Sequence, residues 1–263
     1  MKQTLLAMGL GILMLGAHAQ ANLYWSENFN DNYFNDTLVG ECGNGQGAPC
    51  CGTGISLFIT TWAPRAGSRA GVTRLDKCHE RAEWRGKTNN RPNIGDTRFY
   101  GFSLKPAHNY DANRWTLAMQ LAQWSSSNPA WAEGAWHRLI IENNRWRYVY
   151  KYSENGGQNS SSVKEQSFDL GPVSKNQWTD FIVRGTWKRS NQGKIQVYIR
   201  QPGSSNYTMK YSKTGWIMLN IPQVPYFKVG QYRGDPNWSG INQQDRLYVD
   251  EIKVGQYFGN VDI

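Results

Sequence analysis

Alternation of apolar and polar residues with a period of two is the feature that most restricts how this chain can fold. Such alternation is typical of strands with one face buried and one face in solvent. Turn sequences at 142–144 and 190–193 join two pairs of these segments into hairpins. The ranges that we predict to be strands are 138–141, 145–152, 178–187, 194–200 and 246–254.

No run of ten or more residues follows a helical period. Many short strands separated by turns predict an all-β fold, a concanavalin-A-like jelly roll of two antiparallel sheets. The polar, glycine-containing composition of residues 154–162 predicts an exposed loop. We expect one concave sheet face to form a substrate groove, with functional side chains at positions i and i+2 of its strands.

The N-terminus has the layout of a secretory signal peptide. Lys2 precedes an apolar run from Leu5 to Gly16, and small residues follow at Ala17 and Ala19. The run is shorter than the roughly 20 residues that a membrane anchor needs. We therefore expect residues 1–21 to be removed, leaving a secreted single domain over 22–263, with no membrane partner and no second subunit.

The chain is basic, with a formal charge of +9. Removing residues 1–21, which hold Lys2 and no acid, leaves +8. A basic exported protein attracts nucleic acid, anionic membranes or acidic polysaccharide, and charge alone does not choose among them. The 12 Trp and 14 Tyr residues suit sugar binding, because flat aromatic rings stack on pyranose faces.

The chain has four cysteines, Cys42, Cys50, Cys51 and Cys78. Export and the even number make disulfides plausible. A bridge between the adjacent Cys50 and Cys51 would be strained, so we expect each of them to pair with either Cys42 or Cys78. Zinc binding is the alternative, and the adjacency of Cys50 and Cys51 disfavours it.

A first chemical motif is Arg81-Ala82-Glu83-Trp84-Arg85. On a strand, Arg81, Glu83 and Arg85 share one face, and His79 precedes them on that face. Two guanidiniums around a carboxylate form a prepared site for a second carboxylate. The alternative is a solvated charged strand.

Two further segments complete the pattern. The strand from Trp115 to Ser125 is apolar apart from Gln120 and Gln123, which need a ligand or a backbone group as partner if they are buried. In the second segment, Tyr226 to Arg233, the residues Tyr226, Lys228, Gly230 and Tyr232 share a face. A Tyr beside cations can exchange protons with a substrate, although the aromatic residues could also serve packing alone.

In this order, the three segments resemble the signature segments of jelly-roll alginate lyases. They are closer still to the heparin-lyase-like polysaccharide lyase family, which includes glucuronan lyases. The resemblance extends from about Arg81 to Gly255. The other segments that carry it are Phe99 to Pro106, Gln123-Trp124, Trp178 to Phe181, Gly193 to Tyr198 and Tyr248 to Ile252.

The resemblance implies β-elimination at a uronate, without a catalytic cofactor. It implies Tyr232 as the acid and as a candidate for the base, and a carboxylate held by Gln123, Arg81 and Arg85. The further substrate contacts that we expect are Glu83, Gln120, Lys228, Tyr226, Arg233 and Trp124. Sandwiches of this type often carry a structural calcium, for which Asp250 and Glu27 are the candidates, unless they are plain surface carboxylates.

The chain departs from the family pattern at one position. Many relatives carry a His two residues after the strand Gln, where this chain has Ser125, or Ala122 if Gln120 is the equivalent. We expect His79 to substitute for it, whereas His108 and His137 read as surface residues. The missing His leaves the base open between His79 and Tyr232.

Two other functions fit the fold. A glycoside hydrolase would need two carboxylates flanking the bond, and no matching string of acids is present. A lectin-like module would keep the basic groove without an acid–base pair. Nucleic acid is the less probable partner, because the signal peptide directs the protein out of the cell.

Overall fold

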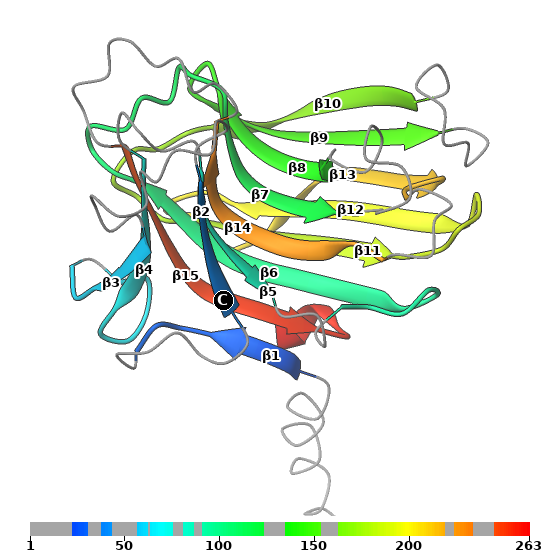
Figure 1. The fold of residues 1–263 in the computed structure, drawn as a ribbon, viewed down its shortest axis with the longest axis horizontal. Coiled ribbons are helices and arrows are strands. Elements are labelled where there is room, and N and C mark those ends of the chain that lie inside the picture. The colour runs from blue at the N-terminus through cyan, green and yellow to red at the C-terminus, as the bar shows by residue number, and fades with distance from the viewer. Residues whose placement is uncertain are drawn as a thin grey trace, which may run out of the picture.

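The computed structural model describes most of the chain, with gaps between the described ranges. These ranges are 23–30, 38–43, 57–62, 64–75, 81–86, 91–123, 135–153, 163–218, 224–233 and 245–263. They form two antiparallel sheets that pack face to face (Figure 1). The jelly-roll sandwich predicted from the sequence is therefore confirmed.

The eight-stranded sheet contains the central strand β15 (Asp245–Gly255), which pairs with β6 along one edge. On its other edge, β15 pairs first with β4 and then with β1. The path through this sheet is β13 (Thr208–Gly215), β12 (Gly193–Arg200), β11 (Thr179–Thr186), β6 (Thr97–Pro106), β15, β4 (Ala70–Leu75) and β3 (Leu57–Thr60), with β1 (Leu23–Glu27) beside β15.

The seven-stranded sheet carries the segments singled out in the sequence. Its strand order is β10 (Val163–Pro172), β9 (Arg145–Ser153), β8 (Ala135–Glu142), β7 (Thr116–Ala122), β14 (Tyr226–Tyr232), β5 (Arg81–Gly86) and β2 (Leu38–Gly43). Strand β14 thus lies between β7 and β5, although these three strands are far apart in the chain. In Figure 1, β7, β8 and β14 bend along their length.

The core lies between the two sheets, and it is rich in aromatic residues. Trp84 from β5 and Trp146 from β9 are fully buried, and Trp146 packs edge-on against Phe181 of the other sheet at 4.9 Å. Burying each such ring contributes about 1.5–3 kcal/mol. Because successive strand residues face opposite ways, burying these rings directs their polar neighbours to the outer faces.

A bulge interrupts this alternation in β7. The register with β8 shifts between Leu117 and Met119, so β7 holds one residue more than its partner there. Ala118 and Met119 both join the core, whereas Leu117 packs in a separate cluster with Ile140. The bulge therefore places Leu117 and Gln120 on the same outer face, three residues apart.

The predicted strands all occur, with ends shifted by at most three residues. The range expected as 138–141 is β8, which extends over Ala135–Glu142. The described residues contain no α-helix, and the helix among them is a 3-10 turn at Phe258–Asn260. No helix in this part of the chain is long and apolar enough to cross a membrane. The strands that were not predicted are β1, β2, β3, β4, β6, β10 and β13. Residues 1–21 and the expected loop 154–162 lie outside the described residues.

Candidate active site

Strand β14 presents a polar face to the outside of the seven-stranded sheet. Phe227 and Val229 belong to the core, so Tyr226, Lys228 and Tyr232 alternate onto the outer face, as predicted. Gly230 lies between Lys228 and Tyr232 with φ +145°, and a Cβ there would meet the Ala82 carbonyl oxygen at 2.4 Å. Glycine is required at this position because neighbouring backbone fills the space of a side chain.

Strand β5 brings the Arg-Glu-Arg motif alongside β14. Arg81 lies opposite Tyr232, and Arg85 lies opposite Lys228 in the strand register. The intervening Ala82 and Trp84 point into the core and are fully buried. Arg81, Glu83 and Arg85 therefore share the outer face with Lys228 and Tyr232.

Glu83 is the centre of the site, and its side chain is fully buried. One carboxylate oxygen accepts a hydrogen bond from Gln120 Nε2 at 2.8 Å. The other lies 3.1 Å from Arg81 Nε and 3.9 Å from Lys228 Nζ. We call Arg81, Glu83, Gln120 and Lys228 the Glu83 cluster. Two cations and an amide surround one carboxylate, which leaves a net positive charge of one.

Tyr232 is joined to the Glu83 cluster through Arg81. The Arg81 guanidinium lies over the Tyr232 ring, 4.6 Å from its centre. Trp115 packs edge-on against the other side of Tyr232 at 6.4 Å. The ring is thus both fixed in position and placed beside a cation.

The glutamine that contacts Glu83 is Gln120. Gln120 lies opposite Lys228 in the register and contacts Glu83. Gln123 follows the last residue of β7, and its side chain is fully buried. The role expected for Gln123 stays a prediction.

Arg233 is a correction to the expected substrate contacts. Its guanidinium is buried on the opposite side of the strand from Tyr232, in an ion pair with Asp245. Its Nε donates to the Thr116 hydroxyl at 2.9 Å. Alternation along the strand accounts for this, since Arg233 is the neighbour of Tyr232 and must face the other way.

The histidines divide into three cases. His79 lies outside the described residues, as does Trp124, so their expected roles stay predictions. His108 is exposed in a turn, as expected. His137 was expected at the surface, but it is buried in the core, where it stacks on Tyr150 and accepts a hydrogen bond from the Tyr148 hydroxyl at 2.9 Å. Burial lowers the pKa of His137 to about 4, which keeps the ring neutral.

The outer face continues across β8, β9 and β10 with charged residues that the sequence did not single out. Arg138 pairs with Glu165, and Arg145 pairs with Asp169. Arg147 Nε donates to the Ser167 hydroxyl at 3.0 Å. The same alternation that predicted β8 and β9 could have placed the polar residues of these two strands on one face.

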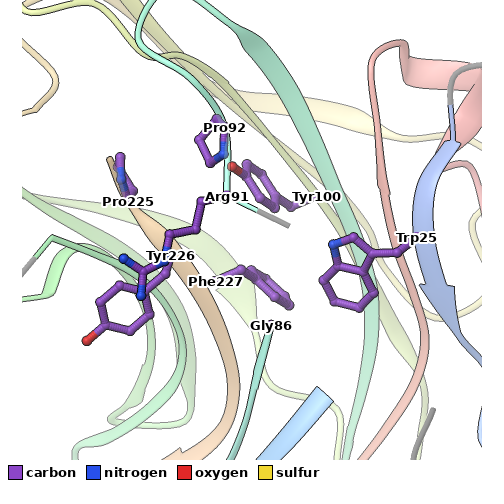
Figure 2. A pocket seen from close by; sticks show the side chains of 8 residues that line it. All are labelled: Trp25, Gly86, Arg91, Pro92, Tyr100, Pro225, Tyr226 and Phe227. Atoms are coloured by element: carbon purple, nitrogen blue, oxygen red, sulfur yellow. The ribbon is translucent and has the colours of Figure 1, made fainter. Parts of the chain in front are cut away.

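A small pocket lies at the start of β14, beside Lys228 of the Glu83 cluster, whose Nζ is 5.5 Å from the centre of the Tyr226 ring (Figure 2). Its walls include Trp25, Tyr100 and Phe227, and Arg91 lies over the Tyr226 ring at 5.0 Å. Tyr226 is six residues before Tyr232, about 20 Å along a strand. The pocket is therefore separate from the residues suited to proton transfer.

The two expected calcium ligands, Asp250 and Glu27, accept hydrogen bonds from backbone N–H groups. Asp250 accepts hydrogen bonds from the backbone N–H groups of Arg65 and Glu251, both at 2.8 Å. Glu27 accepts one from the Phe29 N–H at 2.7 Å. Burial raises the pKa of Asp250 to about 7. Within the described ranges, no group of three or more His, Cys, Asp or Glu side chains could hold a metal ion. The geometry thus gives no support to a calcium ion there.

The disulfide prediction cannot be followed in the structure. Cys50, Cys51 and Cys78 lie outside the described residues, and Cys42 belongs to β2, whose side chains are also not described.

Comparison with known proteins gives two positive findings. The sequence pattern of the family described as Polysaccharide lyase matches residues 45–253. The solved structure of an endo-β-1,4-glucuronan lyase from the fungus Trichoderma reesei is similar, with a TM-score of 0.68 and 17% identity over 90% of this chain and 97% of that chain. No curated protein sequence matches the chain.

Two alginate lyases have the same fold. The enzyme from Aplysia kurodai has a TM-score of 0.60 and 11% identity over 89% of this chain and 99% of that chain. The enzyme from Klebsiella pneumoniae has a TM-score of 0.59 and 11% identity over 88% of this chain and 99% of that chain. At these identities the likeness establishes the fold.

Proposed function

Because this chain belongs to the polysaccharide lyase family and is a polysaccharide lyase, we propose that it cleaves a uronate-containing polysaccharide by β-elimination. The observation that carries the proposal is the position of the Arg81 guanidinium, which contacts both the Tyr232 ring and the Glu83 carboxylate. A phenol suited to proton transfer and cations suited to a sugar carboxylate thus share one surface. Glucuronan and alginate, the substrates named for the similar structures, both contain such units.

The cations of the outer face would stabilise the negative charge that develops during the reaction. The C5 proton of a uronate is weakly acidic, and its removal spreads charge onto the adjacent carboxylate. Arg81, Arg85 and Lys228, together with the amide of Gln120, are placed to hold that carboxylate. Glu83 fixes three of these groups before substrate arrives, so little reorganisation is needed during the reaction.

We assign both proton transfers to Tyr232. Its phenolate takes the proton from C5, the electrons of that bond form the C4–C5 double bond, and the bond from C4 to the leaving oxygen breaks. The Tyr232 hydroxyl then returns the proton to the leaving oxygen. Water is not consumed. His79 is the other candidate base. If His79→Ala loses cleavage, removal of the C5 proton is assigned to His79 instead of Tyr232.

The test is incubation of the protein with glucuronan, alginate and uronate-containing glycosaminoglycans. Elimination creates an unsaturated uronate that absorbs in the near ultraviolet. We expect absorbance to rise with at least one of these polymers, and we expect Tyr232→Phe to abolish the rise while the protein still binds the polymer. Binding without any absorbance change in the wild type would instead indicate a lectin-like protein.

We also propose that the protein acts after export, since its substrate is a high-molecular-weight polyanion. The support is the signal-peptide layout of residues 1–21 and the positive charge of the remaining chain. N-terminal sequencing of protein recovered outside the cytoplasm should begin at Asn22. A full-length N-terminus in that fraction would contradict cleavage.

A further inference from the structure

Four polar side chains form a line across four neighbouring strands of the outer face. Arg85 of β5 lies opposite Lys228 of β14, which lies opposite Gln120 of β7, which in turn lies opposite Arg138 of β8. Neighbouring strands are about 4.8 Å apart, so this line extends over about 15 Å. It crosses the sheet at right angles to the strands.

Arg138 is the member of this line that lies beyond the Glu83 cluster. Its guanidinium pairs with Glu165 of β10, and 16% of its side chain is exposed. The side chain is thus partly open to solvent beside its ion pair with Glu165. A guanidinium has five N–H donors, so Arg138 can bind a second acceptor in addition to Glu165.

We propose that the polysaccharide lies along this line with one sugar unit per strand, and that Arg138 binds the carboxylate of the unit next to the reacting one. This inference rests on the proposed function. A 1,4-linked pyranose unit is about as long as the spacing between neighbouring strands, so successive uronates meet successive strands.

The opposite orientation, with the polymer along the strands, fits less well. Side chains on one face of a strand repeat about every 6.7 Å, which exceeds the length of a sugar unit. Along β5, moreover, the Glu83 carboxylate separates Arg81 from Arg85. A polyanion lying along that strand would meet a negative charge between its two cations.

The test compares Arg138→Gln with Arg145→Gln on uronate oligosaccharides of increasing length. Arg145 is a matched control because it also lies on the outer face in an ion pair, with Asp169, but it lies off the line. Glu165 and Asp169 are both about half exposed, at 50% and 49%, so losing either pair should affect folding little.

For the wild type, kcat/KM should rise when the oligosaccharide becomes long enough to reach Arg138. Arg138→Gln should lower kcat/KM about tenfold on these longer substrates, because a charge-assisted hydrogen bond is lost, and should leave the shortest cleavable substrate unchanged. Arg145→Gln should match the wild type at every length.

Equal activity of Arg138→Gln and the wild type at all lengths would overturn the inference. A uniform loss at all lengths would also overturn it, because that result indicates a structural role for Arg138. If the wild type cleaves no uronate oligomer or polymer, the proposed function itself fails, and this inference fails with it.

Discussion

Replacing Glu83 with Ala should both destabilise the protein and disable the site. The variant removes the acceptor of the Gln120 hydrogen bond and the counter-charge of Lys228, whose side chain is only 6% exposed. Leaving a buried charge without its partner costs about 3–5 kcal/mol. Arg81 is 36% exposed and can recover water, so the lower end of this range applies. We therefore expect a loss of about 3 kcal/mol.

Thermal unfolding followed by tryptophan fluorescence measures this loss. In a domain of this size, 1 kcal/mol changes Tm by about 2–4 °C, so Tm should fall by about 6–12 °C. Asp169→Ala is the control, because it breaks an ion pair with Arg145 in which both side chains are about half exposed, at 49% and 48%. The control should cost less than about 1 kcal/mol. If both variants lower Tm equally, the central role given to Glu83 is wrong.

Three further predictions concern single residues. Gly230→Ala should lower the unfolding free energy by more than about 2 kcal/mol in urea titrations, because the new Cβ would meet Glu83 Cα at 2.7 Å. A change below about 0.5 kcal/mol would contradict the claim that only glycine fits there. His137 has a pKa lowered from 6.5 to about 4, so between these pH values the unfolded chain binds a proton at this residue and the folded protein does not. Stability should therefore fall by on the order of 3 kcal/mol from pH 6.5 to 4, and unfolding at several pH values should show a shallower fall for His137→Gln than for the wild type. Asp180→Ala should cost about 3 kcal/mol because the buried carboxylate accepts hydrogen bonds from Arg65 and Arg200, and a Tm equal to that of the wild type would refute this.

The sequence predicted the fold class well because the core is built on simple alternation. In β12 and β15, buried residues occupy nearly every second position, so the strand pattern is plain in the sequence. Strand β13 was missed because it is an edge strand whose residues are mostly exposed, so no apolar face marks it. Strand β10 is an edge strand too, and charged residues occupy much of its outer face.

The candidate site was predicted in part. The faces of β5 and β14 follow from alternation, so the grouping of Arg81, Glu83 and Lys228 was foreseeable. The outward position of Gln120, which contacts Glu83, depends on the bulge in β7, and the composition of the strand does not reveal that bulge. The burial of His137 depends on aromatic partners from β9 and from the loop after β11, which are brought together only by the packing of the two sheets.

The central claim is that the Tyr232 face breaks the polymer by elimination. The most direct measurement is mass spectrometry of the two fragments from a defined uronate oligosaccharide. Elimination predicts that the fragment masses sum to the mass of the intact oligosaccharide, with the unsaturation in one fragment. A sum larger by one water molecule would show hydrolysis and contradict the account.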